Sequence, residues 1–189
     1  MRRLSICAAA AVLATGCADS VVVNSGSTPP RTETPAPTTT TGRTDPVLVN
    51  AADYYVTADG LKGYYFTTPN GKWSCAILPH SRAGCQAASG ALGIPGEPDT
   101  VENAGGEAVA PNAIAVADQG EPGFTWLAPP GFSVRSGEAQ VLDFNKTLAA
   151  AGFRCNAQEA GVSCLNETTK KGFTFSPNGL TPRYTAVPG

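Results

Sequence analysis

The sequence predicts an all-β fold, a small antiparallel sheet or meander of sandwich-like or barrel-like form, held together by disulfides. Short apolar runs recur from about residue 60 onwards, and turn residues such as Gly, Pro and Asn separate them, as expected of strands joined by turns. Asn70-Gly71 stands between two such runs, residues 63–68 and 72–78, and this dipeptide is a strong hairpin signal. Four cysteines fall in two close pairs, which favours covalent links between neighbouring strands.

The first predicted strands combine aromatic and small apolar residues. In residues 72–78, Trp73, Cys75 and Ile77 alternate with other residues, so their side chains are expected on one face of the strand. Residues 94–123 differ, because they are rich in Gly, Pro and acidic residues. The other strands expected before residue 139 are residues 83–87, 113–117 and 124–127.

Residues 139–151 are compatible with two structures. Val141, Phe144 and Leu148 have the spacing of one face of a helix. Residues 143–146 equally suit a turn between two strands. Beyond this segment, three short strands with Gly- and Asn-containing turns are expected at regular intervals, which is typical of a β meander: residues 152–155, 161–165 and 172–175.

The N-terminal residues have the layout of a secretory signal peptide. Arg2 and Arg3 precede an apolar stretch, residues 4–14. This stretch is too short to span a bilayer, which takes about 20 residues. The chain is therefore expected to be exported.

Residues 13–17, Leu-Ala-Thr-Gly-Cys, resemble a bacterial lipobox. In that family the signal is cut before the cysteine, whose sulfur carries a diacylglyceryl group. The chain departs from the pattern at Ala14, where leucine is usual. The resemblance implies a signal peptide of residues 1–16, lipidation of Cys17, and a location on the outer face of the cell membrane through the lipid anchor. Plain secretion is the alternative.

Composition divides the exported chain into two parts. Residues 17–49 hold the anchor cysteine and a Thr/Pro-rich linker with little apolar content, which is expected to be disordered. Such a linker is also a candidate for O-glycosylation. Residues 50–189 are long enough for a single β-rich extracytoplasmic domain.

Four cysteines remain in the domain after export, and an even number in an oxidising compartment indicates a disulfide framework. We expect Cys75–Cys85 and Cys155–Cys164, because each pair is close in sequence and lies on neighbouring predicted strands. Neither pair has the CxxC spacing of a zinc site, and His80 is the only histidine. No metal site is expected.

A spaced pattern across the domain resembles a small secreted or lipid-anchored domain common in actinobacteria, mycobacteria especially. Its residues are Phe66, Pro69, Gly71, Cys75, Gly84, Cys85, Cys155, Gly161, Val162, Cys164, Asn166, Thr169, Gly172 and Phe173. The resemblance covers roughly residues 60–90 and 110–180. It departs at Lys171-Gly172, where that family commonly has Gly-His. The resemblance implies strand–turn–strand for residues 139–151, and it implies no chemistry because the family has no established activity.

No catalytic residue or cofactor is expected. His80 lies in a predicted loop without a nucleophile motif, and a base of this kind needs an orienting group and a nucleophile within reach. The acidic residues after Asp59 could pair for glycoside hydrolysis, but nothing fixes such a pair, so a cell-wall hydrolase is the least favoured reading. The acidic residues 97–121 lack the spacing of a Ca²⁺ loop.

Aromatic residues are the best candidates for binding. Tyr64 and Tyr65 are adjacent on one strand, so they are expected to face opposite sides. Together with Trp126 they predict a partly exposed aromatic surface for an envelope protein, a glycan or a lipid. Without residues 1–16 the chain has 11 basic and 15 acidic residues, which argues against nucleic acid. A non-enzymatic interaction module is therefore favoured, with a carrier or sensor of a small apolar ligand such as a lipid as the alternative.

Overall fold

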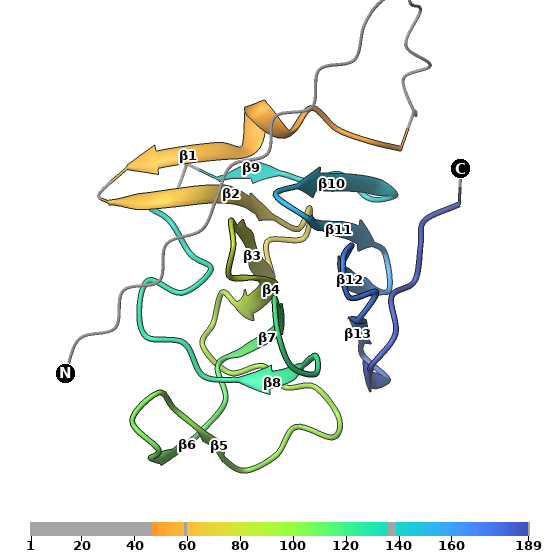
Figure 1. Cartoon of the computed structure of the whole chain (residues 1–189). Helices are drawn as coiled ribbons and strands as arrows, with labels where there is room; N and C mark the ends of the chain where they lie inside the picture. Colours follow the sequence, from red (N-terminus) through yellow and green to blue (C-terminus); the bar gives the residue numbers. More distant parts are fainter. Residues whose placement is uncertain (1–46, 59, 136–138, 189) are drawn as a thin grey trace, which may run out of the picture. The chain divides into compact units, whose positions relative to one another are not determined.

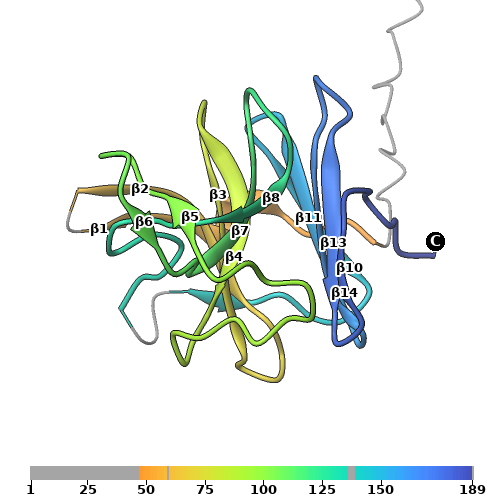
Figure 2. The ribbon, with the colours of Figure 1, turned by 90° about the horizontal axis from the view of Figure 1, so that it is seen from below.

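Two β-sheets face each other in the computed structural model, which describes residues 47–58, 60–135 and 139–188 (Figures 1 and 2). The expected signal peptide, Cys17 and most of the expected linker lie outside the described residues. The described part contains no α-helix, and its strands are antiparallel apart from one short parallel pairing. The predicted all-β, antiparallel fold is therefore confirmed.

The larger sheet contains β1 (Tyr55–Ala58), β2 (Leu61–Thr67), β3 (Trp73–Leu78), β4 (Arg82–Ala87), β7 (Ala113–Ala117), β8 (Gly123–Thr125) and β9 (Gln140–Val141). The smaller sheet contains β10 (Lys146–Ala150), β11 (Phe153–Gln158), β12 (Gly161–Asn166), β13 (Gly172–Ser176) and β14 (Gly179–Thr181). A 3₁₀ turn (Ala51–Tyr54) precedes β1, and β5 (Val101–Glu102) with β6 (Ala108–Val109) forms a separate hairpin. The larger sheet has the order β1-β2-β3-β4-β7-β8 with β9 beside β2, and the smaller sheet runs in sequence order.

The predicted hairpin at Asn70-Gly71 joins β2 and β3. Gly71 has φ +66°, a conformation that costs glycine little, and its N–H donates to the Thr68 carbonyl at 2.8 Å. The turn places Phe66 directly opposite Cys75. A tight local turn thus sets the register of the first two central strands.

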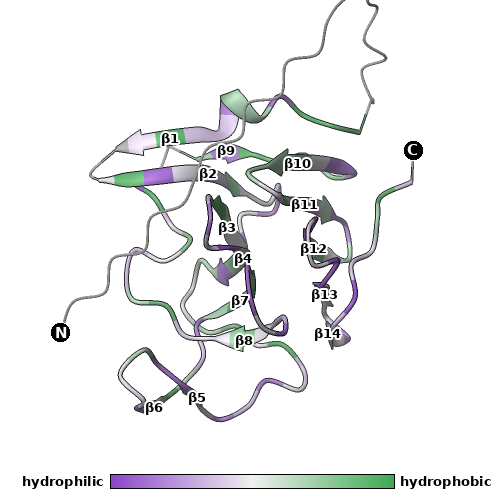
Figure 3. Cartoon of the chain, viewed as in Figure 1, coloured by the Kyte–Doolittle hydropathy of each residue, from purple (hydrophilic) through white to green (hydrophobic). Residues whose placement is uncertain are grey.

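The inner face of the larger sheet carries a row of fully buried apolar residues. Phe66, Cys75, Cys85 and Ile114 stand opposite one another on four adjacent strands. Apolar residues recur along the strands of both sheets (Figure 3), and those on the inner faces form the main core cluster. Burial of this row against the other sheet is the principal stabilising term expected for such a sandwich.

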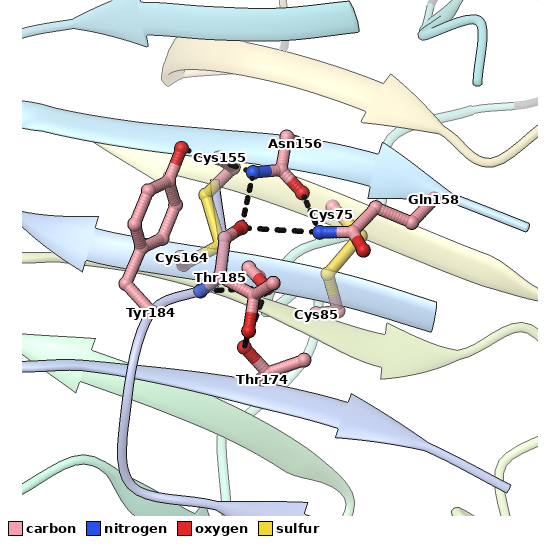
Figure 4. The surroundings of a disulfide bond; sticks show 10 residues. Cys75, Cys85, Cys155, Asn156, Gln158, Cys164, Thr174, Tyr184 and Thr185 are labelled. Carbon is pink, nitrogen blue, oxygen red and sulfur yellow. Dashed lines mark hydrogen bonds between the residues drawn. A yellow bond between two sulfur atoms is a disulfide. The ribbon is translucent and has the colours of Figure 1, made fainter. Parts of the chain in front are cut away.

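The smaller sheet repeats this arrangement. Leu148, Cys155, Cys164 and Phe173 stand opposite one another on β10 to β13 and are fully buried. The cysteines in the middle of each row are bonded, with Cα–Cα distances of 4.0 Å for Cys75–Cys85 and 4.1 Å for Cys155–Cys164. Both predicted disulfides are confirmed (Figure 4).

The outer face of the larger sheet is made of small residues around one tyrosine. Tyr65, Ala76, Gly84 and Ala115 form the outer row on β2, β3, β4 and β7. Phe132, from the segment after β8, packs on this row and is 1% exposed. A Cβ at Gly84 would approach Phe132 Cε2 at 2.8 Å and the Ile114 carbonyl oxygen at 2.1 Å. Small outer side chains therefore allow the segment to lie close to the sheet.

The outer face of the smaller sheet is polar instead. Asn156, Ser163 and Thr174 form a row on β11, β12 and β13. The C-terminal segment covers this row, since Asn156 Nδ2 donates to the Tyr184 hydroxyl and the Thr185 carbonyl, each at 2.9 Å (Figure 4). The Ser163 and Thr174 hydroxyls lie 2.6 Å apart. Hydrogen bonds, rather than apolar contacts, attach the C-terminal segment here.

Residues 139–151 form strand–turn–strand, as the actinobacterial resemblance implied, and not a helix. β9 pairs in parallel with β2, whereas β10 belongs to the smaller sheet. Asn145, with φ +61°, lies in the turn between them. The segment is thus the crossing point from one sheet to the other. Leu48, which the sequence assigned to the linker, pairs with Thr147 on the edge of β10.

Candidate functional site

A groove on the outer face of the larger sheet, with a volume of about 490 Å³, brings together two of the three aromatic residues predicted to bind. We call it the Trp126 groove. Tyr65 and Trp126 both line it, one from β2 and the other from the segment after β8. The remaining lining residues are Gly60, Leu61, Lys62, Leu78, Pro79, Ser81, Arg82, Ala104, Leu127, Ala128, Pro130 and Gly131.

The three predicted binding aromatics have different positions. Tyr65 is 2% exposed and packs with the outer cluster, so it forms part of the floor. This burial raises the pKa of its hydroxyl. Trp126 is half-buried. Tyr64 packs against the inner core cluster, on the opposite face from Tyr65, so the structure does not bring it into the groove.

Tyr55 is a further exposed aromatic residue, in addition to the three residues predicted to bind. It is 45% exposed, and its ring centroid lies 5.1 Å from that of Tyr64. The two residues are direct partners on β1 and β2. Their pairing depends on β1, a strand that the apolar pattern did not predict.

Asn112 fixes the start of the segment that presents Trp126. Its Nδ2 donates to the Leu127 carbonyl at 2.9 Å, and its Oδ1 accepts from the Leu127 N–H at 2.8 Å. One side-chain amide therefore satisfies both polar groups of the residue next to Trp126. Such a two-point contact restricts the backbone beside Trp126.

Gln86 fixes the other end of the same segment. From the outer face of β4, its Oε1 accepts from the Phe132 N–H at 2.8 Å and its Nε2 donates to the Ser133 hydroxyl. The Pro129-Pro130 peptide between the two amide contacts is cis. The wall of the Trp126 groove is consequently attached to the sheet at both ends.

Arg82 supplies positive charge at the Trp126 groove. It is half-buried, and its Nε donates to the adjacent Ser81 hydroxyl at 3.3 Å. Among the described residues it has no ion pair. No acidic residue lines the groove within the described part, although residues 47–189 hold nine basic and twelve acidic residues. The groove is therefore locally cationic on a domain that is acidic overall.

His80 lies in the turn between β3 and β4, where it is exposed and has φ +55°. Within the described residues, no three His, Cys, Asp or Glu side chains gather as metal ligands would. Ion pairs join Arg154 to Glu167 and Lys171 to Glu121, both away from His80 in sequence. The described residues also contain no helix long and apolar enough to cross a membrane.

Comparison with known proteins adds no relationship: no family model, no curated protein and no solved structure matches the chain. The resemblance to the actinobacterial domain therefore stays an expectation from the sequence. The geometry of the Trp126 groove is the basis for the functional argument.

Proposed function

We propose that the chain is a lipid-anchored, extracytoplasmic binding module that holds an extended segment of another envelope protein in the Trp126 groove. The observation that carries the proposal is the meeting of Tyr65 and Trp126 in one groove with apolar walls. Tyrosine and tryptophan supply large contact areas while few side-chain torsions are immobilised. Aromatic-lined grooves of this type suit an extended peptide, including one that contains proline.

The attachment of the groove wall supports binding by a preformed site. Asn112 and Gln86 fix the segment on both sides of the cis Pro129-Pro130 peptide. A ligand then meets a surface whose ordering cost has been met during folding. The hollow form of the site favours insertion of a narrow segment over contact with a flat surface.

Arg82 indicates the charge of the partner segment. A guanidinium without an ion pair on a half-buried rim is best matched by a carboxylate, which it binds in two-point geometry. The partner segment is therefore proposed to carry an acidic residue beside its apolar or proline residues. A carboxylate at this position also contributes to the rate of encounter, because opposite charges steer association.

Selection from a library of ten-residue peptides displayed on phage tests this binding role. Selected peptides should combine an acidic residue with apolar or proline residues, and should bind at least tenfold more weakly to Trp126→Ala and Arg82→Gln. Arg183→Gln, a change of an exposed arginine on the C-terminal segment, is the matched control and should leave binding unchanged. Failure to enrich any peptide, or binding that is indifferent to Trp126→Ala, would overturn the proposal.

The membrane anchor is proposed on the lipobox-like residues 13–17. A Cys17→Ser variant should move from the membrane fraction to the soluble extracytoplasmic fraction, since no other anchor is proposed. Cys7→Ser, within the expected signal peptide, is the control and should leave the protein with the membrane. Retention of Cys17→Ser on the membrane would show that the lipid is not the anchor, without bearing on the Trp126 groove.

A further inference from the structure

A second hollow lies at one end of the sandwich, away from the Trp126 groove, and has a volume of about 330 Å³. We call it the end cavity. Residues of both sheets line it, because the β2–β3, β11–β12 and β13–β14 turns meet around it. Its volume falls at the small end of the range of about 300–1,000 Å³ typical of small-molecule sites.

Aromatic and aliphatic side chains from both inner faces form the floor of the end cavity. Trp73 on β3 packs against Phe175 on β13, with ring centroids 4.4 Å apart. Trp73 is half-buried, so part of its indole ring is accessible from the cavity. Leu92, Ile94 and Val162 are buried beside it. The end cavity thus offers an apolar surface with one tryptophan at its edge.

The rim of the end cavity carries uncommitted hydrogen-bonding groups of both kinds. Lys72 and Glu159 are exposed on opposite turns, and neither has an ion pair within the described residues. Asn70 Oδ1 accepts from the Thr68 hydroxyl and the Lys72 N–H, which leaves its Nδ2 as a donor. Ser176 Oγ accepts from the Asn178 N–H and retains its own proton for donation. Donors and a strong acceptor therefore surround one small apolar floor.

We propose that the end cavity binds a neutral sugar unit. A sugar ring has an apolar face of C–H groups, which matches Trp73, and hydroxyls that both donate and accept, which match the rim. The opposite charges of Lys72 and Glu159 give no preference for a charged ligand. A fatty acid fits less well, because the open rim leaves its chain in contact with water. This site is separate from the Trp126 groove and independent of the function proposed there.

The two tryptophans of the protein make the test specific to one site. Trp73 lines the end cavity and Trp126 the groove, so Trp126→Phe leaves Trp73 as the only tryptophan. Titration of that variant with the methyl glycosides of glucose, galactose, mannose and N-acetylglucosamine should give a saturable change in fluorescence with at least one sugar. Trp73→Phe, which leaves Trp126 as the reporter, should give no change with the same sugar.

Rim variants separate recognition from a general loss of structure. Lys72→Met and Glu159→Gln alter exposed side chains and should leave the thermal midpoint unchanged while each weakens sugar binding about tenfold. Lys62→Met and Glu102→Gln are the matched controls outside the end cavity and should bind like the parent. The proposal would be overturned if none of the four glycosides gave a response, or if Lys72→Met and Glu159→Gln bound the sugar as tightly as the parent. Tighter binding of octanoate or phenylalanine than of any sugar would also overturn it.

Discussion

The two sheets of the sandwich have equivalent inner faces and opposite outer faces. Each inner face carries one row in which a disulfide joins the two central strands and a bulky apolar residue flanks it on either side. The outer row of the larger sheet is small and apolar around Tyr65, whereas that of the smaller sheet is Asn156, Ser163 and Thr174. Both inner faces must pack in the same apolar core, so they are alike. The outer faces differ because a different segment of the chain covers each of them.

The difference locates the proposed protein-binding site. Packing of Phe132 covers the centre of the larger sheet but leaves the Trp126 groove at its side. On the smaller sheet the C-terminal segment satisfies the polar row directly, through Asn156, Gln158 and Thr174. Apolar cover with an open aromatic edge can accept a partner, whereas a row already hydrogen-bonded to its own chain has less to offer one.

The largest effect is expected from Phe132→Ala on the outer face of the larger sheet. Phe132 is 1% exposed and packs on Ala76, Ala113 and Ala115, so truncation leaves a cavity and should lower the free energy of unfolding by about 3–5 kcal/mol. Urea unfolding measures the loss. Val134→Ala, a change of a half-buried residue in the same segment, should cost much less. A loss below 1 kcal/mol for Phe132→Ala would mean that packing of Phe132 does not hold this segment on the sheet.

Removal of either disulfide should have nearly the same effect on both sheets. The bonds close loops with sequence separations of 10 and 9 residues, and each should contribute about 2–3 kcal/mol in the chain-entropy model. The double variants Cys75→Ala/Cys85→Ala and Cys155→Ala/Cys164→Ala are compared by thermal unfolding. If one pair proved dispensable while the other was essential, the inner faces would not be equivalent.

A smaller loss, about 1–3 kcal/mol, is expected from Asn156→Ala on the smaller sheet. The variant removes the two hydrogen bonds that Asn156 Nδ2 donates to the Tyr184 hydroxyl and the Thr185 carbonyl, and each such bond contributes about 0.5–1.5 kcal/mol. Hydrogen exchange should show faster exchange of the Thr185 N–H, which donates to Ser163 Oγ at 3.4 Å. Exchange unchanged from the parent would show that Asn156 does not hold the C-terminal segment.

The smallest effect concerns stability above pH 10. Burial raises the pKa of Tyr65, and burial together with Asp143 and Asp53 raises the pKa of Tyr54, both from 10.0. As the pH rises above 10, these hydroxyls ionise in the unfolded chain before they ionise in the folded protein. The free energy of unfolding is therefore unaffected by the ionisation of these two tyrosines below pH 10 and falls above it. Tyr65→Phe and Tyr54→Phe should each flatten the fall in unfolding free energy between pH 9 and 11. An identical pH dependence in parent and variants would contradict this assignment.

Much of the fold could be predicted because its signals are local. Alternation in β3 placed Trp73, Cys75 and Ile77 on the core face. The structure confirms this, because Cys75 and Ile77 belong to the main core cluster and the half-buried Trp73 packs against it. The Asn70-Gly71 turn and the short separations within each cysteine pair predicted which strands lie next to each other. In contrast, β1, the β5–β6 hairpin and β14 are short and carry little apolar pattern, so they were not predicted. The strand β9 was expected only through the actinobacterial resemblance, because the pattern of residues 139–151 suited a helix equally well.

The sequence predicted the type of residue at the candidate site, aromatic side chains, but not how these residues come together. Alternation correctly separated Tyr64 from Tyr65, but the meeting of Tyr65 with Trp126 depends on how the segment after β8 folds back. The small residues Ala76, Gly84 and Ala115 indicate that another segment can pack closely on this face of the sheet, but they do not identify which segment of the chain does so. The role of Trp73 in the end cavity depends on turns that are distant in sequence, and its alternation pattern indicated only a core residue.

Photocrosslinking in intact cells tests the central claim, that the Trp126 groove holds a partner, most directly. The photoreactive residue p-benzoylphenylalanine replaces Trp126 in one strain and the exposed Glu102 in another. We predict one discrete crosslinked envelope protein from position 126, absent from position 102, and lost when Arg82→Glu is added but kept with Arg183→Glu. The same product from both positions, no product from position 126, or a product that persists with Arg82→Glu would contradict the account.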